Sequence, residues 1–300
     1  SLGILKMYDF LFLICTTEKS KFLSKFLKSV NNLKIKNRRI KLLIIENSIK
    51  KKHKSLIGKT LIKHIPFEYS LEKKIGIPFA RNKALRLSKK IKARYLCFFD
   101  DDCEISRDWM EKIIEFKKKI KSEIVTGPQI PKQKNQYHSI LSKSPYNFQK
   151  LRWAATNNVV IDKKILDKHN IEFSTKLANI GGSDQLFFTQ LNLKGFEIRW
   201  CSNAKVFENQ NNLERNFKWF VKRSFRYGIS SNLIYKEAYG SFKGSLFVIL
   251  KFFYELLFFF NYFALVIINP KKNSLFSIMY LFRSIGSFLS LFGIKTKSYI

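Results

Sequence analysis

Residues 95–102 read YLCFFDDD, an apolar run that ends in three adjacent aspartates. A run of five apolar residues is typical of a buried strand in an α/β sheet. Three neighbouring carboxylates repel one another, and their charge is costly at the end of such a strand unless a cation or several donors share it. Hard oxygen ligands of this kind suit Mg²⁺ or Mn²⁺ bridged to phosphate oxygens. A surface turn followed by a helix N-cap is the alternative that these residues leave open.

Strands and helices alternate around this run, which predicts an α/β fold. Strands are predicted at residues 9–15, 40–45, 61–65, 95–99, 123–126, 153–161, 196–200 and 204–207. Helices are predicted at residues 19–30, 75–90, 107–121, 184–193 and 213–227, with a polar loop-like stretch at 129–150. Short apolar strands separated by helices indicate a mainly parallel sheet covered on both faces. Ligands bind beyond the carboxyl ends of such strands, and the three aspartates lie at one of these ends.

The charge balance limits the class of partner. The chain carries 56 Lys and Arg against 22 Asp and Glu, a formal net charge of +34. Such a surface attracts nucleic acid, anionic lipid or phosphorylated substrates. Its four cysteines are scattered without a Cys-x-x-Cys pair, which favours a reducing compartment over a disulfide framework or a zinc site. The apolar run at 10–15 is too short for the core of a signal peptide.

The composition changes after about residue 240, and only five residues between 246 and 293 are charged. Residues 246–268 would form a helix of roughly 35 Å, enough to cross a bilayer, with Lys251 and Glu255 spaced to pair. The second apolar segment, residues 275–293, has Arg283 near its middle, which would cost about 2.5–3.5 kcal/mol at the bilayer centre. Two spans would also place Lys271 and Lys272 on the far side of the membrane. Helices lying in the cytoplasmic leaflet, or a re-entrant hairpin, are therefore favoured over two spans, and a soluble appendage is the other alternative.

Four ordered segments carry most of the candidate site residues. They are GIPFARNKAL at 76–85, FFDDDCE at 98–104, TNNVVI at 156–161 and GGSDQL at 181–186, followed by GFEIRW at 195–200 and AKVFE at 204–208. Together they resemble the family 2 glycosyltransferases, inverting enzymes with the GT-A nucleotide-sugar fold, and in particular the membrane-associated bacterial type. The resemblance covers roughly residues 8–228. It implies a GT-A catalytic domain at 1–210, a basic amphipathic helical connector at 211–240 and a hydrophobic helical membrane-associated region at 241–300.

The aspartates and one arginine are expected to bind the donor. Loss of a nucleoside diphosphate requires its charge to be neutralised, so Asp102 and Asp100 would hold a divalent cation, Mg²⁺ or Mn²⁺, on the diphosphate. The resemblance implies that Asp100 also contacts the ribose and that Arg81 reaches the nucleotide or its phosphates. A solvated Arg81 is the alternative. Asp101 is grouped with these donor-binding residues without a separate role, and it would otherwise cap or orient the next loop.

Two strand ends depart from the family pattern. Thr16 and Glu46 end the first and second predicted strands, where the resemblance implies contacts to the nucleobase and ribose. The family often has Pro-Thr-Tyr-Asn at the first position, and usually an aspartate at the second, one methylene shorter than Glu46. Gly182 would let the backbone approach a sugar closely.

Asp184 matches the position of the family's catalytic base. An inverting displacement requires a base to remove the proton of the acceptor hydroxyl. Asp184 lies at a predicted helix start, where the positive end of the helix dipole favours a carboxylate, although a plain N-cap is the alternative. The family often has Glu-Asp here, and Ser183 replaces the glutamate. Asn157 and Asn158 fit either contacts to sugar hydroxyls or pairing with backbone groups.

The resemblance predicts an inverting glycosyltransferase at the cytoplasmic face of the cell membrane. It would move a sugar from a nucleotide-diphosphate donor to the hydroxyl of a lipid-linked or saccharide acceptor, in assembly of a cell-envelope polysaccharide or glycolipid. A basic nucleic-acid-binding protein is one alternative, but the sequence has no recognition motif, so no nucleic acid partner is expected. A sugar-phosphate nucleotidyltransferase is the other. It would be expected to have a glycine-rich loop after the first strand, and residues 16–19 read TTEK.

Overall fold

The computed structural model describes residues 7–62, 65–133, 136–141, 144–209 and 216–294. The chain forms two compact units that are discontinuous in sequence. The first unit comprises residues 1–132, 145–175 and 187–209, and the second comprises 133–144, 176–186 and 210–300.

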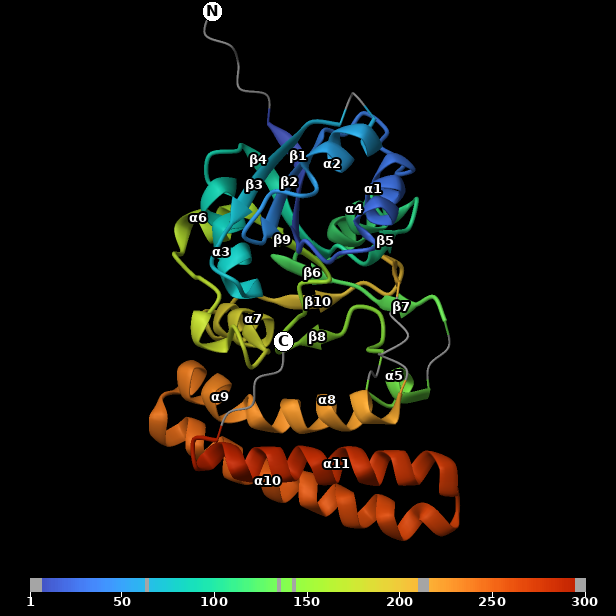
Figure 1. Ribbon diagram of the computed structural model, residues 1–300, viewed down its shortest axis with the longest axis vertical. Helices are drawn as coiled ribbons and strands as arrows, with labels where there is room; N and C mark the ends of the chain where they lie inside the picture. The colour runs from blue at the N-terminus through green and yellow to red at the C-terminus, as the bar shows by residue number, and fades with distance from the viewer. Residues whose placement is uncertain (1–6, 63–64, 134–135, 142–143, 210–215, 295–300) are drawn as a thin grey trace, which may run out of the picture. The chain divides into compact units, whose positions relative to one another are not determined.

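The first unit is built on an eight-stranded sheet with the order β3-β2-β1-β4-β9-β6-β10-β8 in the part of the chain described (Figure 1). These strands are β1 (Tyr8–Thr16), β2 (Ile40–Asn47), β3 (Phe67–Glu72), β4 (Ala93–Asp100), β6 (Ile124–Thr126), β8 (Lys150–Leu151), β9 (Asn158–Asp162) and β10 (Ile198–Trp200). A three-stranded sheet consists of β5 (Cys103–Ile105), β11 (Val206–Glu208) and β7 (Gln129–Pro131). The helices of this unit are α1 (Leu23–Asn31), α2 (Lys54–Thr60), α3 (Ile77–Ser88), α4 (Trp109–Lys119) and α6 (Lys163–Lys168).

The large sheet is mainly parallel, as the sequence predicts. Strands β3, β2, β1 and β4 are parallel neighbours, and β10 is parallel to β6. Strand β9 runs antiparallel between β4 and β6, and β8 runs antiparallel to β10. The predicted α/β fold is therefore confirmed, with antiparallel pairing at β9 and at the β8 edge.

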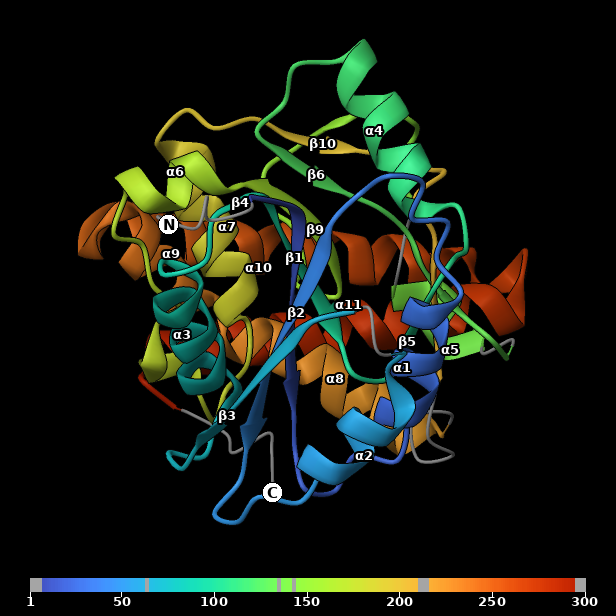
Figure 2. The ribbon, with the colours of Figure 1, turned by 90° about the horizontal axis from the view of Figure 1, so that it is seen from above.

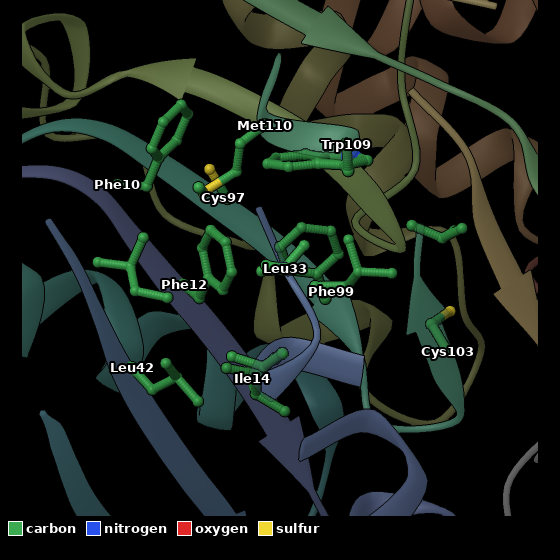
Figure 3. Packing of buried hydrophobic residues seen from close by; sticks show 14 of the residues in the cluster. Phe10, Phe12, Ile14, Leu33, Leu42, Cys97, Phe99, Cys103, Trp109 and Met110 are labelled. Atoms are coloured by element: carbon green, nitrogen blue, oxygen red, sulfur yellow. The ribbon is translucent and has the colours of Figure 1, made fainter. Parts of the chain in front are cut away.

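Side chains of β1 alternate between two cores, one on each face of the sheet. Phe10, Phe12 and Ile14 belong to the core under α1, α2 and α4, whereas Leu11 and Leu13 belong to the core under α3 and α6. Figure 2 shows these helices on both sides of the central strands. In Figure 3 the rings of Phe12, Phe99 and Trp109 pack together, and the Phe99 centroid is 5.0 Å from each of the other two. Burying each such side chain contributes about 1.5–3 kcal/mol, which fixes the end of β4.

The predicted strand at residues 61–65 is wrong. Residues 61, 62 and 65 lie outside any strand, residues 63–64 lie outside the described residues, and the third strand is β3. Leu61 and Ile65 are buried because this loop packs against the core after α2. Strand β3 lies at an edge of the sheet. Because several of its residues are polar, it does not form the apolar run by which the other strands are predicted.

Two further predicted boundaries change. The predicted strand at 153–161 begins only at Asn158, and the loop-like stretch at 129–150 contains β7, α5 (Gln136–Leu141) and the start of β8. These strands are only two to five residues long, too short for periodicity to identify.

The second unit is helical in its described part. Besides α5 it contains α8 (Phe217–Ile229), α9 (Ser231–Tyr239), α10 (Ser241–Ala264), a 3₁₀ turn at Leu265–Ile267 and α11 (Pro270–Leu291). Helix α8 starts at Phe217 because the side chain of Asn216 accepts a hydrogen bond from the Trp219 amide at 2.7 Å. Residues 213–215 of the predicted helix lie outside the described residues. Helix α7 (Ser183–Leu193) starts in this unit and ends in the first.

Helices α10 and α11 form an apolar hairpin (Figure 1). Residues 241–267 and 270–291 are each long and apolar enough to cross a membrane by length and composition. The predicted pair is confirmed: Lys251 Nζ lies 2.6 Å from Glu255 Oε1 and also donates to Ser287 Oγ at 3.0 Å. Ser287 donates to the other oxygen of Glu255 at 2.7 Å. Lys251 and Glu255 are thus paired inside the hairpin.

Candidate active site

The carboxyl ends of three parallel strands place four predicted donor-binding residues at one edge of the large sheet. Thr16 of β1 is opposite Glu46 of β2, and Cys15 of β1 is opposite Asp100 of β4. Asp101 follows directly, and its Oδ2 accepts a 2.5 Å hydrogen bond from the hydroxyl of Thr16. In parallel sheets this edge is where ligands bind.

Arg81 belongs to the same cluster. Gly76, with φ of 135°, starts the turn into α3, and Pro78 in the first helical turn presets the helix. One turn further, Arg81 Nη2 lies 3.8 Å from Asp100 Oδ1, and its guanidinium is 5.4 Å from the Phe173 ring centroid. The arginine is only 8% exposed, so its charge is held in place beside that carboxylate.

Asn82 explains why the motif pairs an arginine with an asparagine. Its Nδ2 donates to the Phe173 carbonyl at 2.9 Å, and its Oδ1 accepts from the Phe173 amide at 2.7 Å. These two bonds hold the ring of Phe173 where the Arg81 guanidinium stacks on it. Asn82 therefore helps to fix the cation of Arg81 at the edge of the sheet through two hydrogen bonds to the backbone of Phe173.

The three aspartates have three different environments. The side chain of Asp100 is 41% exposed beside Arg81. Asp101 is turned toward β1, and burial raises its pKa despite the hydrogen bonds from Thr16 and Ser20. The carbonyl of Asp102 accepts bonds from the Asn209 backbone at 2.8 Å and side chain at 3.0 Å, which fixes the backbone of the third aspartate.

Asp100 and Asp102 fit a hard divalent cation. Both are partly exposed carboxylates at the sheet edge, and oxygen is the ligand type that Mg²⁺ and Mn²⁺ prefer. The neighbouring Cys103 thiol donates to Asp102 Oδ1 at 3.6 Å, and burial raises its pKa well above the usual value.

The carboxylate of Glu46 already accepts hydrogen bonds from other groups of the protein. It is fully buried and accepts hydrogen bonds from the Tyr69 hydroxyl, from Ser48 Oγ at 3.2 Å and from the backbone amides of Lys52 and His53. Burial alone would raise its pKa, but these donors outweigh burial and lower it. Glu46 thus shapes the loop after β2, and its contact to a nucleotide stays a prediction.

Asn158 pairs with backbone groups and with Trp109. Of the two roles that the sequence allows for it, the structure therefore favours pairing with backbone groups over contacts to sugar hydroxyls. Its Oδ1 accepts from the indole of Trp109 at 2.9 Å, and its Nδ2 donates to the carbonyls of Ala204 at 2.7 Å and Pro128 at 3.1 Å. Asn157 differs, because its amide donates to the side chain of Gln129 and it is half-buried. Sequence reasoning missed Trp109 and Asn209 as partners of the motif residues, since neither contact leaves a local pattern.

Gly182 and Asp184 lie in the second unit, in the turn that begins α7. Gly181 and Gly182 have φ of 88° and 87°, and a Cβ on Gly182 would lie 2.7 Å from Ile234 Cδ1. Both observations explain why glycines are needed here. The helix starts at Ser183, so Asp184 occupies the first turn rather than the cap position, and its Oδ1 accepts from the Gln185 amide at 2.9 Å.

Comparison with known proteins identifies the fold class. Staphylococcus aureus TarS in complex with UDP-GlcNAc superposes with a TM-score of 0.54 at 13% identity, covering 76% of this chain and 66% of that chain. GalNAc-T7 with UDP, GalNAc and Mn²⁺ superposes with a TM-score of 0.55 at 11% identity, covering 76% and 51%. The chain spans only 39% of the longer TarS structure. At these identities the likeness concerns the fold, and that fold is the GT-A glycosyltransferase fold.

The sequence comparisons give the family. The profile described as "Glycosyl transferase family 2" matches residues 12–173, more than half of the chain. The succinoglycan biosynthesis protein ExoM of Rhizobium meliloti (strain 1021) is 25% identical over 240 residues, covering 76% of this chain and 75% of that protein. The chain belongs to glycosyl transferase family 2 and is a transferase enzyme. The two alternatives, a nucleic-acid-binding protein and a nucleotidyltransferase, are thereby set aside.

Proposed function

We propose that the protein is an inverting glycosyltransferase that moves a sugar from a nucleotide-diphosphate donor to an acceptor hydroxyl. The observation that carries this proposal is the end of β4 on a family 2 fold, where Asp100 lies 3.8 Å from Arg81 and Asp102 follows two residues later. Two partly exposed carboxylates, one of them beside a fixed guanidinium, suit a diphosphate that arrives with a divalent cation.

Each donor-binding residue has a proposed task. Asp100 and Asp102 would hold the Mg²⁺ or Mn²⁺ ion, whose chemistry when bound is to neutralise charge on the leaving diphosphate. Arg81 would orient the phosphates or nucleotide, as a fixed cation requires no rearrangement on binding. Thr16 and Glu46 would border the nucleotide, and Asp101, bonded to Thr16, would hold the strand ends together.

Asp184 is the proposed base. The acceptor oxygen forms a bond to the anomeric carbon while the bond from that carbon to the diphosphate oxygen breaks, and the electron pair leaves with the nucleoside diphosphate. The acceptor proton passes to the Asp184 carboxylate. A single displacement of this kind inverts the configuration at the anomeric carbon. Gly182, which precedes this helix, would allow close approach of a sugar.

The second unit supports a role in polysaccharide or glycolipid assembly at a membrane. ExoM is named as a succinoglycan biosynthesis protein, and its aligned region covers three quarters of its length. On α10 the side chains of Phe253, Leu257, Phe260 and Phe263 are each more than half exposed. Such a contiguous apolar face suits lipid better than water.

We favour a hairpin that lies in the cytoplasmic leaflet over two complete spans. Helix α11 packs along α8, and Arg283 of α11 lies 5.2 Å from the ring centroid of Tyr227 on α8. A spanning α11 would draw α8, with exposed Lys218 and Lys222, into the hydrocarbon. A hairpin in one leaflet leaves those lysines near the lipid headgroups.

The test is a donor screen with the full-length protein in nanodiscs. UDP-, GDP- and dTDP-sugars are added with Mn²⁺, and thermal shift and donor turnover are recorded. One donor class should stabilise the protein, by about 2.7 kcal/mol at a concentration of 100 times the dissociation constant. EDTA should abolish turnover, and Asp102→Asn should lose far more activity than Asp101→Asn, which keeps an acceptor for Thr16. Turnover that is indifferent to EDTA, or equal losses in the two variants, would contradict the metal assignment.

A further inference from the structure

Three arginines of the second unit surround a single tyrosine. The guanidinium carbons of Arg223, Arg226 and Arg283 lie 5.7, 5.8 and 5.2 Å from the ring centroid of Tyr227. Arg223 also donates through Nε to the Tyr227 hydroxyl at 3.2 Å. Two of these arginines belong to α8 and the third to α11, so the cluster exists only in the folded protein.

Two glycines bring the helices close enough for this contact. A Cβ on Gly228 of α8 would lie 2.2 Å from the carbonyl oxygen of Arg283, and one on Gly286 of α11 would lie 2.4 Å from that of Phe225. No other residue type fits at such distances without a backbone shift. Because α8 and α11 cross so closely, the turn of α11 that contains Arg283 lies directly against the basic face of α8.

The cluster brings three guanidinium charges around one ring. Burial alone would raise the pKa of Tyr227, yet the charges of Arg223 and Arg226, together with Arg283, lower it. Like charges held together repel, and cation–π contact offsets this only in part. The Nε of Arg283 is moreover a buried donor without a hydrogen-bond partner in the described part of the chain. Buried donors of this kind are rare in folded proteins, and a bound acceptor is one explanation for this one.

The position of the cluster connects it with the proposed base. The guanidinium of Arg226 packs over Gly181, with Nη1 3.4 Å from where a Cβ of that glycine would lie. Gly181 begins the turn that carries Asp184 into α7. The same unit contains the apolar hairpin, whose α11 contributes Arg283. Three guanidinium groups, a candidate base and an apolar surface thus belong to one unit of the fold.

We propose that Arg223, Arg226 and Arg283 bind the phosphate of a lipid-linked acceptor, whose hydrocarbon chain lies along the hairpin of α10 and α11. Planar guanidinium groups match phosphate oxygens in bidentate geometry, and Arg283 Nε would gain its acceptor. An amphiphilic phosphate is the ligand class that suits both a cationic cluster and an adjoining apolar face. This inference rests on the proposed function, and it narrows the acceptor from any hydroxyl compound to one that carries a lipid phosphate.

The experiment measures binding of farnesyl diphosphate and of farnesol to the full-length protein in neutral phosphatidylcholine nanodiscs. EDTA is present, so that no divalent cation draws the diphosphate toward Asp100 and Asp102. Wild type should prefer farnesyl diphosphate over farnesol by about tenfold or more, as expected for charge-assisted hydrogen bonds. Arg226→Gln and Arg283→Gln should each abolish most of that preference, and Arg283→Lys should restore part of it. Inorganic diphosphate should bind more weakly than farnesyl diphosphate, since it lacks the lipid.

Lys222→Gln is the matched control, because it removes the same charge from an exposed position of α8. It should leave the preference unchanged. The ratio of two ligands measured on each variant does not depend on the folded fraction of the sample. A wild type without the preference, or arginine variants that keep it, would overturn the proposal. Failure of the proposed function would be seen separately, as absence of donor turnover in wild type with Mn²⁺.

Discussion

Replacing Asn158 by alanine should destabilise the first unit strongly. The side chain is 1% exposed and makes three hydrogen bonds, to the indole of Trp109 and to the carbonyls of Pro128 and Ala204. At a net value of about 1 kcal/mol each, the three bonds contribute roughly 3 kcal/mol. The three partners are left without the amide, which adds to this cost. Since Asn158 pairs in register with Phe99, the loss falls directly beside the aspartates.

The measurement is urea unfolding followed by tryptophan fluorescence. In a Trp219→Phe background the remaining tryptophans, Trp109, Trp153 and Trp200, all belong to the first unit, so the transition reports that unit. Asn158→Ala should lower the free energy of unfolding of this transition by about 3 kcal/mol or more, with an unchanged urea dependence.

Asn157→Ala is the control for this experiment. Asn157 is adjacent and half-buried, and its amide donates to the side chain of Gln129. Its loss should cost about 1 kcal/mol or less. Equal effects of the two substitutions, or a loss below about 1 kcal/mol for Asn158→Ala, would refute the assignment of Asn158 as the residue that joins β9 to α4 and to the loops before β7 and β11.

Other substitutions test the buried carboxylates and the helix crossing. The pKa of Glu46 is lowered in the folded protein. Its contribution to stability is therefore present above the pKa of the unfolded chain, near 4.5, and is lost as pH falls through the pKa of the folded protein. In urea titrations the unfolding free energies of wild type and Glu46→Gln should converge at acidic pH. Gly286→Ala should cost about 1–3 kcal/mol in thermal unfolding of the second unit, because the added Cβ meets backbone, and wild-type stability would contradict the close crossing. Glu255→Ala should lower the stability of the hairpin in nanodiscs by about 3–5 kcal/mol, whereas the double replacement of Lys251 and Glu255 by Met and Leu should be nearly neutral; equal losses would mean that the buried pair is not coupled.

The sequence predicts the central sheet well because its strands are buried on both faces. Such strands are continuous apolar runs, and the run before Asp100 is the clearest of them. An apolar run does not mark a strand where buried residues lie in a loop or where a strand is polar. Residues 61–65 contain buried apolar side chains in a loop, while the polar edge strand β3 has no apolar run.

The candidate site is predictable in its residue types but not in its contacts. Three adjacent aspartates predict a charged strand end, yet only the fold shows that Asp101 turns to Thr16 while Asp100 lies beside Arg81. Only part of the arginine cluster is predictable: Arg223 and Arg226 fall in the predicted basic helix, whereas Arg283 lies on a separate helix that meets it at two glycines. Long-range packing of this kind is set by shape, which a single sequence does not encode in any local pattern.

The measurement that tests the central claim most directly is sugar transfer by Asp184→Asn. The variant keeps the size of the side chain and removes only its capacity to accept the acceptor proton. With the donor found in the screen, and with Mn²⁺, transfer should fall by about 10²–10⁴-fold while the donor-dependent thermal shift remains that of wild type. Transfer at the wild-type rate would contradict the assignment of Asp184 as the base, and with it the proposed division of the site between donor-binding aspartates and an acceptor-activating one.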